Sequence, residues 1–243
     1  MSIQEQEHQY HTHLMYDTAN TTTWDPKEHI PEGVAELLAQ AATTTAGGTN
    51  SSAYPLAFFH ILQTLKLQKR TGWLDNGIGK EVAESISDHM HRMSLMGLIL
   101  KNPNIDRHKC MLISLVHDVA ESLVGDITPF DGKIDKNEKH LRELAAIEYI
   151  CNDIVSKYNE EAGKEILNRW LDYEDQRNLE AVYAKDLDKF EMLVQCFEYE
   201  KLHGGKKDLS QFYSCVDEIT TDEVKSWLQG LMNEREHFLS KLK

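Results

Sequence analysis

The spacing of apolar residues is the feature that most constrains the fold of this chain. From Tyr54 onward these residues recur every three to four positions, which places them on one side of a helix. The first such series is Leu56, Phe59, Leu62 and Leu65. No run of alternating apolar residues is bounded by hairpin turns, and no repeat period is visible. The sequence therefore predicts an all-α fold, a helical bundle with short connections.

Caps and breakers divide this pattern into successive helices. Ser85 with Asp88, and Thr220 with Glu223, have the spacing of capping boxes at helix starts. The predicted helices are one ending near Lys69, one from residues 85–87 to Asn102 and Pro103, one from Asp106 to Gly125, one from about Asp135, one from about Asn178 to Gly204, and one after Thr220.

The first 50 residues differ from the rest of the 243-residue chain. They are polar and contain Pro26, Pro31 and the start of the tract TTTAGGTNSS at 43–52. Composition elsewhere is ordinary for a globular protein, with 41% hydrophobic and 27% charged residues. We predict a flexible N-terminal arm over 1–50 and one folded domain over 51–243.

Charge and hydropathy exclude several classes of partner. The 40 acidic residues outnumber the 26 basic ones, and a net charge of −14 would repel a nucleic-acid polymer, although a mononucleotide needs only one or two local cations. No apolar stretch approaches the roughly 20 residues of a membrane span. The opening segment lacks the pattern of a secretory signal, and the four cysteines form no CxxC pair. We expect a cytoplasmic protein with reduced thiols, and the nucleus stays an alternative.

An ionisable pair, His117 and Asp118, lies inside the predicted apolar helix LISLVHDVAESLV. Burying such a pair without compensation is costly. One interpretation is a core histidine hydrogen-bonded to a carboxylate. Another is a metal site, because Glu121 follows His117 by four residues and would share its helical face, as in HExxH motifs.

Three further residues favour the metal interpretation. Asp126 follows directly after Gly125, where the helix is expected to end. His89 and Asp188 each interrupt the apolar pattern of another predicted helix. Imidazole and carboxylate groups are the ligands that suit divalent Mn, Fe, Co or Zn.

Taken together, these motifs resemble those of the HD-domain phosphohydrolase superfamily. The matching segments are SDHMHRM at 87–93, HDVAESLVGD at 117–126 and KDLDKFEM at 185–192. With RTGW at 70–73 upstream, the pattern is similar to the 5′-deoxynucleotidase branch, including the eukaryotic HD domain-containing protein 2 group. The resemblance covers about residues 54–213 and implies a helical bundle of the HD-domain type.

The resemblance also implies a ligand set and an activity. The activity is hydrolysis of deoxyribonucleoside 5′-monophosphates by a homodimer that uses Mn, Co, Fe or Zn, with Mg as a candidate for a second site. Asp186 is a rival to Asp188, because residues two apart on a helix point to nearly opposite sides and periodicity allows either. The implied metal ligands are His89, His117, Asp118 and Asp188. We expect Glu121, which transfers the proton, and Asp126 to be the catalytic residues. The expected substrate contacts are phosphate binding by Arg70 and sugar contacts by Trp73 and Asp126.

Two rival functions stay open on the sequence. The first keeps the fold and changes the substrate to a nucleoside triphosphate, a guanosine polyphosphate or a cyclic nucleotide. The second is a non-catalytic binding protein stabilised by its metal. Glu121 favours hydrolysis, because a structural metal site needs ligands and no additional acid.

Overall fold

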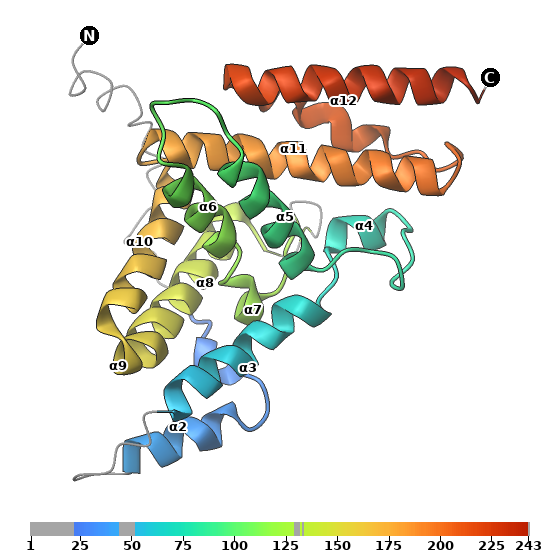
Figure 1. Cartoon of the computed structure of the whole chain (residues 1–243). Coiled ribbons are helices and arrows are strands. Elements are labelled where there is room, and N and C mark those ends of the chain that lie inside the picture. The colour runs from blue at the N-terminus through green and yellow to red at the C-terminus, as the bar shows by residue number, and fades with distance from the viewer. Residues whose placement is uncertain (1–21, 44–51, 129–131, 133, 243) are drawn as a thin grey trace. The chain divides into compact units, whose positions relative to one another are not determined.

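The computed structural model describes residues 22–43, 52–128, 132 and 134–242 (Figure 1). Every regular element within these residues is helical, and the pairing of Lys69 with Ser85 is an isolated antiparallel bridge. The all-α prediction is confirmed. The chain divides into two compact units, each built from separate segments. We call them the His117 unit, residues 13–88 and 116–171, and the His89 unit, whose described part is residues 89–115 and 172–242.

The His117 unit has its core along one face of α3 (Ala53–Leu67). Ala57, Ile61 and Leu65 recur every four residues on that face and are buried. Helix α3 packs against α2, α7 and the π-helix η2. The other elements of the unit are η1 (Pro26–His29), α2 (Val34–Thr43), α4 (Thr71–Asp75), α7 (Glu121–Val124), α8 (Lys136–Glu148), η2 (Tyr149–Val155), α9 (Ser156–Tyr158) and most of α10 (Glu160–Asp175).

The predicted N-terminal arm, 1–50, falls partly outside the described residues. Within its described part, η1 and α2 are helical, and α2 packs against α3. Helix α10 was not anticipated from the sequence pattern. The division into an arm and a domain at residue 50 stays a prediction.

The His89 unit is organised around α11 (Leu179–Leu202), along which α12 (Asp222–Ser240) lies (Figure 1). Leu187, Leu193 and Phe197 of α11 are buried in its hydrophobic core. The unit also contains α5 (Ile86–Leu98) from His89 onward, α6 (Arg107–Val116) to Leu115, and the 3-10 helix η3 (Ser210–Glu218). No helix of the described residues combines the length and the apolar character that a membrane span requires.

One of the two expected capping boxes forms. The backbone N–H of Asp88 donates to Ser85 Oγ at 3.1 Å, and the N–H of Ser85 donates to Asp88 Oδ2 at 2.8 Å. The box expected from Thr220 and Glu223 is wrong. Glu223 instead accepts hydrogen bonds from the backbone N–H groups of Lys101 and Asn102, so its carboxylate is committed elsewhere.

The single helix expected from Asp106 to Gly125 is also wrong. Helix α6 ends at Val116, residues 117–120 form turns, and α7 begins at Glu121. Bonds of the i to i+3 type replace the helical ladder, from Val119 N–H to the Val116 carbonyl and from Glu121 N–H to the Asp118 carbonyl. His117 and Asp118 therefore lie in a turn between two helices, so the shared helical face assumed for His117 and Glu121 does not exist.

Candidate active site

In the His89 unit, the imidazole of His89 lies between two carboxylates of α11. His89 is fully buried; its Nδ1 is 2.5 Å from Glu191 Oε2, and its Nε2 is 3.1 Å from Asp188 Oδ1. A carboxylate can only accept, so Glu191 takes the Nδ1–H. In its neutral form this imidazole would direct its Nε2 lone pair toward the same space as Asp188 Oδ1. Two electron-pair donors at this separation suit joint coordination of a cation, so His89 and Asp188 fit the predicted metal chemistry.

The structure separates the two candidate aspartates of α11. Asp186 is buried, and its carboxylate accepts hydrogen bonds from the backbone N–H groups of Thr220 and Thr221 at the start of α12. Asp188 instead accepts the hydroxyl of Tyr173 on Oδ2 at 2.6 Å, and its Oδ1 faces His89. Asp186 is thus a cap for α12, which favours Asp188 as the ligand.

Sequence reasoning missed Glu191 and Arg92, which lie beside this candidate ligand pair. Glu191 is fully buried, and Arg92 bonds to it through both Nε and Nη2. Burial opposes the charge of Glu191, but His89 and Arg92 outweigh it, so the pKa of this carboxyl lies below its ordinary value. The available signal was the three-residue spacing from Asp188, which puts both carboxylates on one face of α11.

In the His117 unit, three side chains meet at one carboxylate oxygen. Asp118 Oδ2 lies 3.2 Å from Nε2 of the buried His117. The same oxygen accepts a hydrogen bond of 3.1 Å from Nη1 of Arg70. Arg70 thus offsets the charge of Asp118, and the arginine and the His-Asp pair are brought together as the sequence predicts.

Glu121 is a buried acid of this unit. No described residue donates a hydrogen bond to its Oε2, and Lys139 Nζ lies 3.8 Å from its Oε1. Burial, followed by the charges of Asp118 and Asp126, raises the pKa of the Glu121 carboxyl well above its ordinary value, against the effect of Lys139 and Arg70. A carboxyl whose pKa is raised in this way is suited to proton transfer.

Lys139 of α8 was not identified from the sequence. It lies 3.4 Å from Glu143 and is therefore paired with two carboxylates, Glu143 and Glu121. Burial opposes its charge, but Glu143 and Glu121 outweigh it and raise the pKa of the ammonium group. Lys139 is thus a fixed positive charge beside Glu121.

The segment around Arg70 also binds Asp126 and contains Trp73. Thr71 donates its backbone N–H to Asp126 Oδ2 and its hydroxyl to the Asp126 carbonyl. Trp73 is buried with 2% exposure, and its Nε1–H donates to Glu84 Oε1 at 2.8 Å. Arg70, Asp126 and Trp73 therefore belong to one connected segment, while contact of Trp73 with a sugar stays a prediction.

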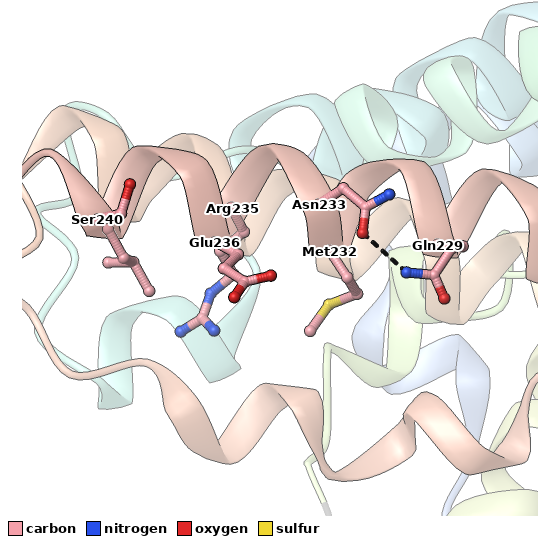
Figure 2. A pocket seen from close by; sticks show the side chains of 7 residues that line it. Gln229, Met232, Asn233, Arg235, Glu236 and Ser240 are labelled. Atoms are coloured by element: carbon pink, nitrogen blue, oxygen red, sulfur yellow. Dashed lines mark hydrogen bonds between the residues drawn. The ribbon is translucent and has the colours of Figure 1, made fainter.

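A pocket on α12 lacks the side chains of a metal site (Figure 2). Its lining contains no histidine, and its two ionisable side chains are Arg235 and Glu236. Arg235 is already paired with Glu200 through two hydrogen bonds of 2.7 Å. The residues with ligand chemistry lie elsewhere, on α5, α11 and the turn at 117–120.

Known proteins resemble this chain over most of its length. The family model for the HD domain matches residues 62–227. The protein named 5′-deoxynucleotidase YGK1 of Saccharomyces cerevisiae is 49% identical over 220 residues, which cover 90% of this chain and 97% of its own. The human protein named 5′-deoxynucleotidase HDDC2 is 35% identical over 199 residues, covering 82% of this chain and 94% of its own.

Two solved structures also resemble this chain over most of its length. The HD domain-containing protein YGK1 matches with a TM-score of 0.67 and 42% identity, over 89% of this chain and 100% of its own. The PH0347 protein of Pyrococcus horikoshii matches with a TM-score of 0.58 and 25% identity, over 75% of this chain and 99% of its own.

Proposed function

The chain belongs to the HD-domain family, and on that premise we propose that it is a metal-dependent 5′-deoxynucleotidase. The reaction splits a deoxyribonucleoside 5′-monophosphate into a deoxynucleoside and phosphate. Relatives that carry this name are up to 49% identical over 90% of the chain. The structural observation that carries the proposal is Glu121, a buried acid with a raised pKa, placed beside the charged cluster of Asp118, Arg70 and Lys139.

The proposed metal ligands are His89, Asp188, His117 and Asp118. His89 and Asp188 offer an imidazole nitrogen and a carboxylate oxygen in the His89 unit, and His117 and Asp118 offer the same pair in the His117 unit. This donor set suits Mn, Co, Fe or Zn, with Mg as a candidate for a second site. When bound, such an ion supplies a Lewis acid that polarises the phosphoryl group and makes water a better nucleophile.

The proposal gives each of the remaining side chains a role that its contacts support. Glu121 transfers the proton, either from the attacking water or to the departing 5′ oxygen. Arg70 has a fork of donors, of which one nitrogen is hydrogen-bonded to Asp118, and the fork is suited to phosphate oxygens. We propose that Asp126, whose carboxylate accepts the backbone N–H of Thr71, contacts a sugar hydroxyl. In the same proposal Trp73 limits the space for a 2′-hydroxyl.

The test is phosphate release from matched deoxyribo and ribo nucleotides. Protein stripped with EDTA should release no phosphate, and Mn or Co should restore release from deoxyribonucleoside 5′-monophosphates in preference to ribonucleotides. Nucleoside triphosphates, guanosine polyphosphates and cyclic nucleotides serve as alternative substrates. If the protein hydrolysed only one of these alternatives, that nucleotide would replace the deoxyribonucleoside monophosphate as the proposed substrate. Absence of turnover with every metal would favour the non-catalytic binding protein.

We also propose that the enzyme is a cytoplasmic homodimer without nucleic-acid polymers or membranes as partners. The net charge of −14 supports the exclusion of polymers. Exposed apolar side chains near the end of α5, Leu95 and Ile99, give a surface that a second copy would bury. Mass measurement by light scattering tests the dimer, and imaging of the tagged protein tests the location.

A further inference from the structure

A carboxylate outside the proposed ligand set fixes the imidazole of His89. Glu191 and His89 are both fully buried, and Glu191 Oε2 accepts the Nδ1–H of His89. The nitrogen that remains, Nε2, is the one that faces Asp188 Oδ1. Glu191 therefore determines which ring nitrogen is available as a ligand, because the proton on Nδ1 leaves the lone pair on Nε2.

Arg92 in turn fixes Glu191. It lies one turn after His89 on α5, and its Nε donates to Glu191 Oε1 at 2.7 Å. The other nitrogens of its guanidinium donate to Gln195 and Glu198, further along α11, at 2.7 and 2.8 Å. The planar fork thus binds three side chains on one face of α11, which restricts rotation of the Glu191 carboxylate.

We propose that Glu191, held by Arg92, is a positioning residue that orients His89 for metal binding. The inference rests on the proposed function, because it assumes that His89 is a ligand. Partners that accept the second ring N–H of a metal-binding histidine fix its tautomer and orientation, and their loss typically weakens metal affinity by about 10- to 100-fold. Tyr173, which donates to Asp188 Oδ2, provides a similar restraint on the neighbouring carboxylate.

The central variant is Glu191→Gln, which keeps the size of the side chain. A glutamine has one acceptor oxygen, whereas the site contains two donors, His89 Nδ1–H and Arg92 Nε–H. Mn²⁺ affinity measured by calorimetry should fall by about tenfold or more. Raising the Mn²⁺ concentration should then restore much of kcat, which it would not do if the substitution had only damaged the fold.

A second variant and a matched control separate positioning from stability. Arg92→Met should also weaken Mn²⁺ binding, by a smaller factor than Glu191→Gln. Because this variant keeps Glu191, it still tests the positioning role if Glu191→Gln does not fold. Arg235→Met breaks another arginine–glutamate pair of the same unit, with Glu200, and should leave Mn²⁺ affinity unchanged. Thermal unfolding in EDTA reports the cost of each substitution to the fold.

The outcomes distinguish this inference from the proposed function. Mn²⁺ affinity of Glu191→Gln within twofold of the unmodified protein, or an equal loss in Arg235→Met, would overturn the positioning role. His89→Ala tests the metal site separately. If this variant loses Mn²⁺ binding while Glu191→Gln retains it, the positioning role of Glu191 is overturned and His89 remains the proposed ligand. Undiminished Mn²⁺ binding by His89→Ala would overturn the metal site itself.

Discussion

Asp186 and Asp188 are two residues apart on α11 and serve different partners. Asp186 caps the start of α12 through Thr220 and Thr221, whereas Asp188 receives the Tyr173 hydroxyl and faces His89. The helical geometry that sends side chains two positions apart to nearly opposite sides thus separates an aspartate that caps α12 from the aspartate proposed as a metal ligand.

Exchange of each aspartate for asparagine should separate these two roles. Asp186→Asn replaces a charged acceptor of the Thr220 and Thr221 N–H groups by a neutral one and should lower the free energy of unfolding by about 1 kcal/mol, with Mn²⁺ binding retained. Asp188→Asn should lose Mn²⁺ affinity and turnover at little cost to unfolding in EDTA. Denaturant titration and calorimetry on both variants check this, and loss of Mn²⁺ binding in the Asp186 variant alone would reverse the assignment.

Glu121→Gln should retain the metal and lose the rate. The amide keeps the shape of the side chain but cannot carry the proton, so kcat should fall by about 10²- to 10⁴-fold. Phosphate release at saturating Mn²⁺, with metal content measured on the same samples, checks this. Glu143→Gln is the matched control, because Glu143 is paired with the same lysine, Lys139, as Glu121 but is not the proposed proton-transfer residue. A fully active Glu121 variant removes this residue from the mechanism.

The same substitution should change the pH dependence of stability in metal-free protein. The folded state raises the pKa of Glu121 well above its ordinary value, mainly through burial. Its contribution to stability is therefore fully present below the unfolded pKa of about 4.3 and is lost as pH rises through the folded pKa. Melting in EDTA should show Glu121→Gln more stable than the unmodified protein at pH 8, with the difference disappearing near pH 4. A difference independent of pH would contradict this.

Arg70→Lys should raise KM for deoxyribonucleoside monophosphates while the free energy of unfolding changes little. Lysine keeps the charge near Asp118 but lacks the planar fork that binds two phosphate oxygens at once. A loss of about 1.5–3 kcal/mol corresponds to a rise in KM of roughly 10- to 100-fold. Steady-state kinetics check this against Arg142→Lys, whose arginine pairs with Glu138 in the same unit. Equal effects in the two variants would exclude a specific phosphate role for Arg70.

Local sequence signals predicted several of the helices. The buried face of α3, however, is formed by Ala57, Ile61 and Leu65, whereas Leu56 and Phe59 of the expected apolar series are exposed. The helical spacing in α11 and the box of Ser85 with Asp88, which forms within four residues of chain, were predicted correctly. These features depend on neighbours in sequence, so a pattern suffices to find them.

Features that depend on distant partners were missed. The cap of α12 comes from Asp186, 34 residues before Thr220, so the local Thr220–Glu223 signal was misleading. The break of the helix at His117 has no Gly or Pro to mark it. Glu191 and Lys139 look like ordinary charges of exposed helix faces, and only the folded arrangement shows what they contact.

The separation of His89 and Glu191 along the chain has a consequence for biosynthesis. They are 102 positions apart, so α5 leaves the ribosome long before the carboxylate that accepts its imidazole proton. At 5–20 residues per second, the delay is roughly 5–20 s. During that interval the nascent chain carries a histidine destined for the interior with its eventual partner still untranslated. Native closure around α5 must therefore wait until α11 emerges, which makes this part of the protein a late event in cotranslational folding.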